Sequence, residues 1–137
     1  MTILVVDAQG GGLGKALIEK IRTAKLPVTV IGVGTNSAAT SALLKAGADT
    51  GATGENAVIY NAKHVDVIMG GMGILSANAM MGEISPAMSA AVSQSDALKL
   101  LIPLNRCNVI VCGVRDMPLP AKIDLAIEEI RALLAKE

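Results

Sequence analysis

The residues best suited to bind a ligand lie in a glycine-rich segment near the start of the chain, Asp7-Ala8-Gln9-Gly10-Gly11-Gly12-Leu13-Gly14-Lys15. An apolar run (residues 3–6) precedes this segment, and helix-like apolar spacing follows it. A strand, a glycine loop and a helix in this order present free backbone N–H groups to an anion, with the positive end of the helix dipole behind them. The segment therefore predicts a site for a phosphate-bearing ligand, formed by Asp7, Gln9, Gly10, Gly11, Gly12, Leu13 and Gly14.

This segment resembles three known phosphate-binding motifs, but it differs from each of them at one or two positions. The dinucleotide form G-x-G-x-x-G requires glycine where Lys15 stands, and the P-loop requires a hydroxyl where Ala16 stands. The nearest form is the T-G-x-x-x-G-x-G signature of short-chain dehydrogenases, from which only Asp7 and Ala8 depart. The alternative interpretation is that the glycines only let the following helix pack close to the first strand.

The end of the second predicted strand constrains the ligand. Dinucleotide-binding folds place an acidic residue there, which holds the ribose hydroxyls of NAD. Here Gly34-Thr35-Asn36 occupies that place, so binding of plain NAD is disfavoured. ATP hydrolysis is also disfavoured, because the hydroxyl of the P-loop is missing at Ala16. The cofactor stays undetermined, with NADP or another phosphate-bearing nucleotide as the candidates. Thr35 and Asn36 join the candidate ligand-binding residues.

No residue is identified as catalytic. Tyr60-Asn61-Ala62-Lys63 is one residue shorter than the Tyr-x-x-x-Lys pair of short-chain dehydrogenases, and it lies before the third predicted strand. His64 is the only histidine and has no nucleophile placed to pair with it, and Cys107 beside Arg106 is better explained as a packed thiol. No cluster of His, Cys, Asp and Glu has metal-ligand spacing. The sequence therefore predicts no metal site and leaves open whether the protein is an enzyme.

The composition indicates a single aliphatic domain over residues 1–137. The chain is 52% hydrophobic and 18% charged, without Phe or Trp, so the core must consist of Ile, Val, Leu, Ala and Met. A small domain this apolar predicts a homo-oligomer, formed through Met-rich helices over residues 75–92. The zero net charge disfavours nucleic-acid binding. The chain shows neither a signal-peptide pattern nor a membrane-length apolar run, so we expect a cytoplasmic protein without a membrane partner.

Strand and helix patterns alternate along the chain. They predict strands over residues 3–6, 28–33, 65–69, 99–103 and 109–113, and helices over about 13–24, 37–46, 55–63, 75–81, from 86 onward and 121–135. Too few residues separate the last two strands for a parallel crossover, so the fifth strand is expected to be antiparallel. The result is an α/β fold, a three-layer α/β/α sandwich with a five-stranded, mostly parallel sheet in the order 3-2-1-4-5 or 2-1-3-4-5.

Both orders place a topological switch point beside the first strand, and further candidate residues share that edge of the sheet. The polar bridge over residues 49–56 must climb back to this edge if the strands are parallel, and a second glycine cluster follows the third strand. Arg106, in the expected hairpin turn, is the cation best placed to clamp a phosphate. The candidates added here are Thr53, Asn56, Gly70, Gly71, Gly73 and Arg106.

Several longer strings resemble a family of small bacterial α/β proteins classed as a domain of unknown function. Besides the glycine-rich segment, they are Leu44-Lys45-Ala46-Gly47-Ala48, Gly51-Ala52-Thr53-Gly54-Glu55-Asn56-Ala57, Tyr60-Asn61-Ala62-Lys63, Gly82-Glu83-Ile84-Ser85-Pro86-Ala87-Met88 and Ile102-Pro103-Leu104-Asn105-Arg106-Cys107-Asn108. The resemblance covers essentially the full length. It implies a Rossmann-like fold and no established activity.

Three functions are compatible with these residues. The first is a protein, enzymatic or sensory, that binds a nucleotide or phosphorylated small molecule at the glycine loop. The second is an oligomeric structural or partner-binding subunit that kept the fold without a ligand. The third, disfavoured by the length of the chain, is an NADP reductase resembling the short-chain dehydrogenases.

Overall fold

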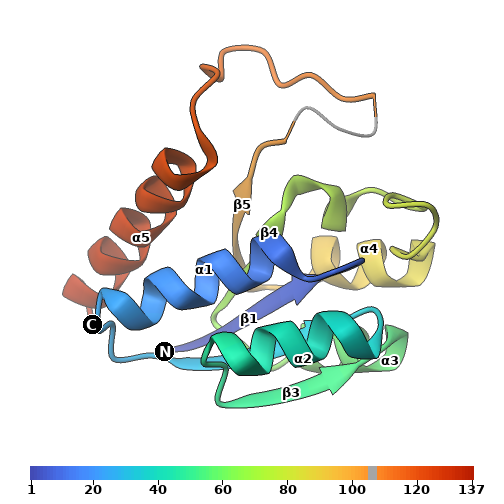
Figure 1. The fold of residues 1–137 in the computed structure, drawn as a ribbon, viewed down its shortest axis with the longest axis horizontal. Coiled ribbons are helices and arrows are strands. Elements are labelled where there is room, and N and C mark those ends of the chain that lie inside the picture. The colour runs from blue at the N-terminus through green and yellow to red at the C-terminus, as the bar shows by residue number, and fades with distance from the viewer. Residues whose placement is uncertain (105–107) are drawn as a thin grey trace.

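The computed structural model describes residues 1–104 and 108–137, in which strands and helices alternate along the chain (Figure 1). The strands are β1 (Thr2–Asp7), β2 (Thr29–Gly34), β3 (Thr50–Thr53), β4 (Val67–Gly71) and β5 (Leu98–Ile102). The α-helices are α1 (Gly12–Thr23), α2 (Ser37–Ala46), α3 (Glu55–Asn61), α4 (Pro86–Gln94) and α5 (Leu119–Ala135), and a 3-10 helix, η1, spans Met72–Leu75. None of the described helices is long and apolar enough to span a lipid bilayer.

All strand pairs of the described sheet are parallel, and the strands follow the order β3-β2-β1-β4-β5. The chain therefore moves outward from β1 through β2 to β3, and then crosses to β4 on the other side of β1. This reversal produces the predicted topological switch point at the carboxyl end of β1. The register pairs Asp7 with Gly34 and Gly34 with Thr53, so these three strand ends lie along one edge of the sheet.

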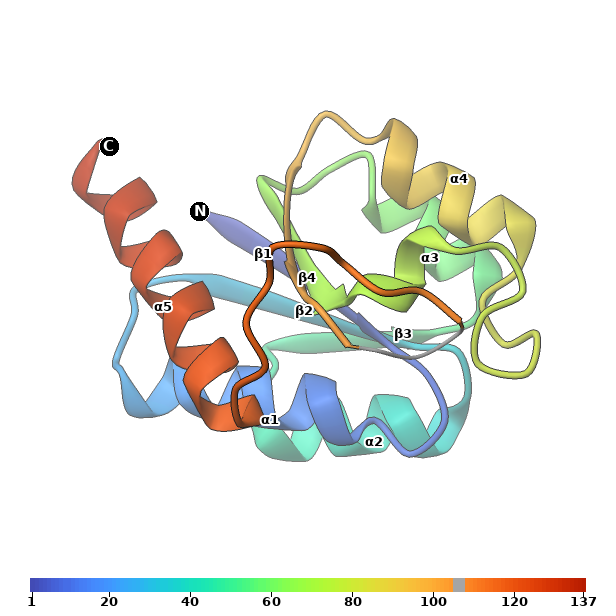
Figure 2. The ribbon, with the colours of Figure 1, turned by 90° about the horizontal axis from the view of Figure 1, so that it is seen from above.

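The alternation of apolar side chains along the strands divides the core into two halves. On one face of the sheet, Ile3 and Val5 pack with residues of α1, α2 and α5. On the other face, Leu4 and Val6 pack with residues of α3, η1 and α4. Figure 2 shows α1 and α2 on one side of the sheet and α3 and α4 on the other. The predicted layers of the α/β/α sandwich are therefore confirmed, and β1 is buried on both faces.

The predicted antiparallel strand over residues 109–113 is wrong. The described residues contain no strand there, and Val109 and Ile110 are exposed by 36% and 80%. β5 ends at Ile102, and the next residue, Pro103, has no N–H with which to extend the pairing of this strand. The apolar run after it therefore lies outside the sheet.

The fifth strand of the sheet is instead β3, at the opposite edge and within the segment predicted to be a polar bridge. For the predicted segments, the second expected order is the one observed, because the run over residues 65–69 (β4) lies beside β1, and β5 lies beside β4. The first expected order, which placed that run beside the second strand, is wrong, since β3 occupies that position. β3 packs closely under α2: a Cβ on Gly51 would lie 3.0 Å from the Leu44 side chain. The predicted climb of the bridge is confirmed, since Thr53 ends beside Gly34.

The predicted helix over residues 75–81 is also wrong. Beyond η1, residues 76–85 form a turn-rich loop (the 76–85 loop) that is closed on itself by backbone hydrogen bonds. Asn78, Met80 and Met81 have φ angles of 66°, 57° and 59°. These left-handed angles cannot continue a right-handed helix, so the Met-rich stretch contains one α-helix, α4, and not two.

Two predicted helix starts are confirmed. Asn36 caps α2, with its side-chain oxygen accepting the Ala39 N–H at 2.9 Å. Ser85 caps α4, with its hydroxyl oxygen accepting the Met88 N–H at 3.2 Å. Proline occupies the first position of α4, where its missing N–H removes no helical hydrogen bond. Both caps pair a backbone N–H group in the first turn of the helix that follows.

Candidate functional site

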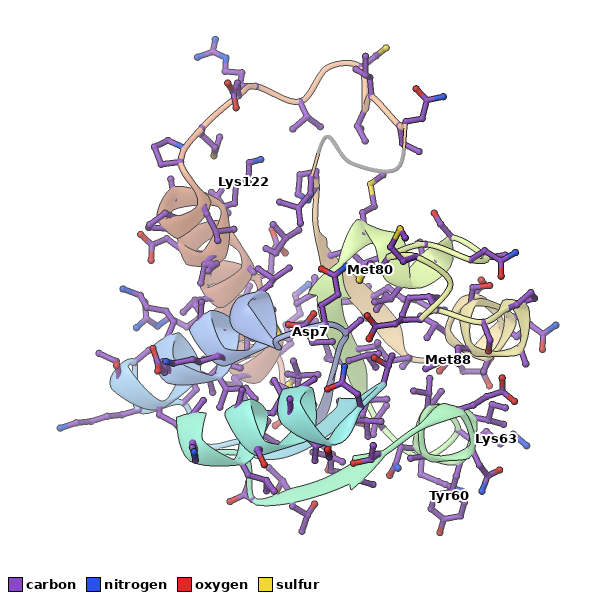
Figure 3. The ribbon with its side chains drawn as sticks, turned by 45° about the vertical axis from the view of Figure 1, so that its right-hand side comes forward. Asp7, Tyr60, Lys63, Met80, Met88 and Lys122 are labelled. Carbon is purple, nitrogen blue, oxygen red and sulfur yellow. The ribbon has the colours of Figure 1, made fainter. Side chains whose placement is uncertain are left out.

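Asp7 lies where β1 turns into the glycine loop (Figure 3). Its carboxylate accepts the Ala8 N–H at 2.8 Å and the Gly14 N–H at 2.6 Å, and the residue is only 7% exposed. Burial raises the pKa of this carboxyl, although the two amide hydrogen bonds lower it, and the nearby charge of Glu83 raises it further. Asp7 therefore caps the glycine loop from the inside.

Two glycines of the loop are explained by packing. Gly11 has a φ of 74°, and a Cβ at this position would lie 3.0 Å from the Cα and carbonyl oxygen of Ala39. A Cβ on Gly14 would lie 2.5 Å from Leu43 Cδ2 and 3.0 Å from Asp7 Oδ2. These two glycines let the loop and α1 approach α2 and β1 closely, as the packing interpretation of the loop requires.

Two other glycines of the loop have no such explanation. A Cβ on Gly10 or Gly12 would meet nothing within 4 Å, and neither residue has a left-handed φ. The N–H groups of Gly10, Gly12 and Leu13 donate to no acceptor in the described ranges 1–104 and 108–137. Gly12 and Leu13 are the first two residues of α1, where a helix leaves its first amides unpaired, and Gly10 lies in the loop just before the cap residue Gly11.

A third feature of this edge is the carboxylate of Glu83, from the 76–85 loop. Its Oε1 accepts the Gln9 N–H at 2.9 Å, the Thr35 hydroxyl at 2.7 Å and the Asn36 side-chain amide at 2.9 Å. The Thr35 hydrogen bond, followed by that of the Gln9 amide, holds the pKa of Glu83 below its usual range. The Asn36 amide also donates to the Gln9 carbonyl at 2.9 Å. Three of the predicted binding residues thus converge on one carboxylate oxygen.

Thr53 lies at the predicted edge but is engaged by the protein. Its hydroxyl is 2.7 Å from the hydroxyl of Thr40, a buried residue of α2. Thr40 Oγ1 also accepts the Gly34 N–H at 3.2 Å and lies 3.1 Å from the Ala52 carbonyl oxygen. Thr40 therefore joins β2, α2 and β3, while Asn56 is exposed on α3.

The second glycine cluster also packs against protein atoms. A Cβ on Gly70 would lie 2.7 Å from the Val6 carbonyl oxygen, and one on Gly71 would lie 3.1 Å from Leu13 Cδ2. A Cβ on Gly73 would lie 3.2 Å from the methyl carbon of a methionine in the 76–85 loop. These contacts explain the three glycines without a ligand, because β4 and η1 closely approach β1, α1 and the 76–85 loop.

The remaining candidates lie elsewhere. Arg106 and Cys107 fall outside the described residues, so the predicted phosphate clamp stays a prediction. Tyr60 and Lys63 are exposed on or next to α3, away from Asp7 (Figure 3). The Tyr60 ring lies 4.8 Å from the His64 ring, measured between centroids. This surface shows no relation to the glycine loop.

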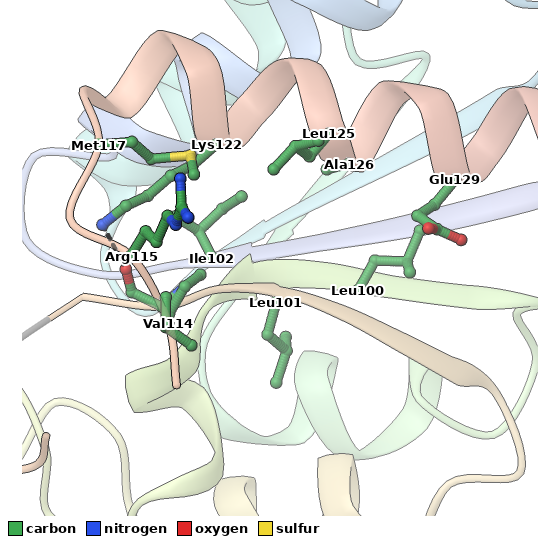
Figure 4. A pocket seen from close by; sticks show the side chains of 11 residues that line it. Leu100, Leu101, Ile102, Val114, Arg115, Met117, Lys122, Leu125, Ala126 and Glu129 are labelled. Carbon is green, nitrogen blue, oxygen red and sulfur yellow. Dashed lines mark hydrogen bonds between the residues drawn. The ribbon is translucent and has the colours of Figure 1, made fainter. Parts of the chain in front are cut away.

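A cavity of about 320 Å³ lies between β5 and α5 (Figure 4). Aliphatic side chains such as Leu100 and Leu125 form much of its wall, and Arg115 and Glu129 also line it. Lys122, another lining residue, donates to the Pro103 carbonyl at 2.9 Å. None of the predicted ligand-binding residues lines this cavity, so it is a feature separate from the candidate site.

The sequence interpretation missed Glu83 as a member of the site. One signal was available, because Glu83 is the only charged residue between Asp66 and Asp96. A lone carboxylate in a long uncharged stretch is a candidate for hydrogen bonds with donors from another part of the chain. The sequence did not indicate which donors these are.

Comparison with known proteins identifies a family and one similar fold. A solved structure, a dodecameric FMN-dependent Ubix-like decarboxylase from Escherichia coli O157:H7, is similar over 93% of this chain and 75% of that chain, with 17% sequence identity and a TM-score of 0.46. No curated protein matches the chain. Residues 2–135 match the family described as "Domain of unknown function (DUF3842)", which confirms the resemblance found in the sequence: the chain belongs to this family.

Proposed function

We propose that the protein binds a phosphate-bearing small molecule, either a nucleotide or a phosphorylated metabolite, with one phosphate on the glycine loop. The observation that carries this proposal is the set of N–H groups on Gly10, Gly12 and Leu13, which find no acceptor in the described part of the chain. A phosphate accepting from them would pair donors that the fold leaves unpaired, and the dipole of α1 would favour its charge.

The distribution of glycines supports the same proposal. Packing explains Gly11 and Gly14, whereas the surroundings of Gly10 and Gly12 would accommodate a side chain. Glycine at positions 10 and 12 would let a ligand approach the backbone closely, because no side chain covers it there. The loop also lies at the carboxyl end of β1, between β2 and β4, where open α/β sheets bind their ligands.

A thermal-shift panel of NADP, NAD, ATP and sugar phosphates tests this proposal. A ligand present at a hundred times its Kd stabilises the folded state by about 2.7 kcal/mol, which raises the Tm of a domain this size by roughly 10 °C. Gly12→Val should fold, because a side chain there meets open space, and should lose the shift by covering the loop amides.

The matched control is Ala132→Val, a substitution of the same kind at an exposed position of α5. This variant should keep the full ligand-induced shift. If Gly12→Val also keeps the shift, the ligand binds elsewhere. If no panel member shifts the wild-type protein, phosphate binding is refuted for these ligands.

An oligomeric subunit without a ligand is the second candidate. It is favoured by exposed apolar side chains at or near β5, an edge strand of the described sheet, including Leu98, Val114 and Leu125. In the expected interface over residues 75–92, Met88 is buried within its own chain, and the exposed large apolar side chains are Leu75, at 39%, and Met81, at 96%. Light scattering that shows a stable dimer, together with an unresponsive ligand panel, would favour this candidate.

A further inference from the structure

The Glu83 carboxylate is held by donors from two segments remote from its own loop. The Gln9 N–H comes from the glycine loop, and the Thr35 hydroxyl and Asn36 amide come from the turn between β2 and α2. All three donors meet on a single oxygen, at distances between 2.7 and 2.9 Å. Phosphate and carboxylate groups use the same charge-assisted donors, so this set is built to hold an anionic oxygen.

The donors on Gln9, Thr35 and Asn36 lie next to the glycine loop. Asp7, the other nearby carboxylate, does not accept from them. Gln9 directly precedes Gly10, so the donor amide at Gln9 and the unpaired amide at Gly10 are consecutive in the chain. The Asp7 carboxylate is already turned to the amides of Ala8 and Gly14. Glu83 is therefore the carboxylate that must leave if a ligand is to use these donors.

Glu83 can leave without unpacking the core. Met81 is 96% exposed and Gly82 is also exposed, whereas Ile84 and Ala79 anchor the 76–85 loop in the core. Near this exposed tip, the Glu83 side chain is held by its hydrogen bonds to Gln9, Thr35 and Asn36. Rotation of the Glu83 side chain would therefore free these three donors for a ligand. The backbone anchors of the loop can stay in place.

We propose that Gln9, Thr35 and Asn36 form a second anion subsite beside the glycine loop, and that Glu83 fills this subsite in the free protein. The ligand then carries two anionic groups: a phosphate for the loop amides, and a further phosphate or carboxylate that replaces Glu83. A nucleotide with a phosphate apart from its main phosphate chain, or a phosphorylated carboxylic acid, meets this description. The inference rests on the proposed function, because it assigns the second group of the same ligand.

A ¹H–¹⁵N NMR titration with inorganic phosphate at constant ionic strength tests the subsite. Glu83→Ala should bind phosphate about tenfold or more tightly than wild type, because removing an internal occupant raises the fraction of open sites. The shifts should appear at the Gln9 amide and the Asn36 side-chain amide. Glu83→Gln should gain less, since its amide oxygen still accepts from the same donors. Adding Thr35→Val to Glu83→Ala should cancel the gain.

The matched control is Glu55→Ala, which removes an exposed carboxylate bonded to the Ser85 hydroxyl without vacating the subsite. It should bind phosphate as wild type does, which separates the subsite from a general loss of negative charge. If Glu83→Ala does not fold, the smaller gain of Glu83→Gln over Glu55→Gln carries the test.

Phosphate binding by Glu83→Ala that is equal to or weaker than that of wild type overturns the subsite. A clear loss of affinity would mean that the Glu83 carboxylate itself contacts the ligand. Shifts confined to Gly10, Gly12 and Leu13 overturn the subsite and leave the proposed function standing. No shift in any variant also overturns the subsite, and the nucleotide panel then decides the proposed function separately.

Discussion

Asp7 and Glu83 accept hydrogen bonds from consecutive backbone amides of one loop. The Ala8 N–H donates to Asp7 Oδ1 at 2.8 Å, and the Gln9 N–H donates to Glu83 Oε1 at 2.9 Å. Burial raises the pKa of Asp7, whereas hydrogen bonds lower the pKa of Glu83. Asp7 therefore belongs to the internal packing of the loop, and Glu83 belongs to the edge where a ligand would arrive.

Removal of the Asp7 carboxylate should destabilise the fold. Asp7→Ala leaves the Ala8 and Gly14 amides without their acceptor in a buried position, at a cost of about 2–4 kcal/mol in the free energy of unfolding. Asp7→Asn keeps one acceptor oxygen and should lose less. Urea denaturation measures both, with Asp96→Ala at an exposed position as the control. Equal stability of Asp7→Ala and the control would refute the capping role.

Adjacent glycines of the loop should respond differently to alanine. Gly11→Ala forces a left-handed φ on a residue with a side chain and brings its Cβ to 3.0 Å from the Ala39 backbone, for a loss of about 1–3 kcal/mol. Gly10→Ala enters open space and should change stability by no more than about 0.5 kcal/mol. Chemical denaturation of the two variants compares them directly. A similar loss at both positions would mean that packing accounts for the whole loop.

The buried hydroxyl of Thr40 should be required to hold the β3 edge. Thr40→Val keeps the shape of the side chain but removes the hydroxyl that accepts the Gly34 N–H and meets the Thr53 hydroxyl, so it should cost about 1–3 kcal/mol. Hydrogen exchange over residues 50–53 should also become faster. Thr29→Val, at an exposed position of β2, is the matched control and should change neither. Unchanged exchange over residues 50–53 in Thr40→Val would argue against this link.

The amino-terminal ends of β2 and β3 should show a pH dependence that involves Asp49. Asp49 Oδ2 accepts the Val30 N–H at 2.8 Å and pairs with Arg22 Nη2 at 2.8 Å, and these contacts, that of Val30 first, lower the pKa of Asp49. The unfolded state then binds more protons, so this stabilisation is present above the ordinary pKa of 3.8 and is lost as pH falls through the lowered value.

The measurement is the difference in free energy of unfolding between wild type and Asp49→Asn as a function of pH. This difference should be largest near neutral pH and should shrink toward zero on acidification, because the amide of the variant does not titrate while the wild-type carboxylate becomes protonated. Asp116→Asn, at an exposed position, should leave the pH profile unchanged. A difference that is constant with pH would show that the charge of Asp49 contributes nothing.

Features decided within a few residues could be predicted from the sequence. The caps at Asn36 and Ser85 are of this kind, because each side chain accepts an amide three residues further along. The buried strands β1, β2 and β4 were visible as apolar runs, since strands covered on both faces have few polar residues. The carboxyl ends of these strands therefore indicated which edge of the sheet holds Asp7, Gly34 and Thr53.

Features decided by contacts between distant segments could not be predicted. The four residues of β3, Thr-Gly-Ala-Thr, have no strand-like pattern and form a strand through pairing with β2 and packing under Leu44. The run over residues 109–113 has a strand-like composition but lies outside the sheet. Glu83 reaches the Gln9 amide across 74 positions, and no local pattern predicts that contact. A long-range hydrogen bond of this kind follows only from the topology.

The most direct test of anion binding by the glycine loop is a ¹H–¹⁵N NMR titration of the wild-type protein with NADP, ATP and inorganic pyrophosphate. For at least one of these ligands, the largest shifts should fall on the amides of Gly10, Gly12 and Leu13, and Gly12→Val should lose them. Shifts confined to the cavity between β5 and α5, or no saturable shift with any of the three ligands, would contradict anion binding by the loop.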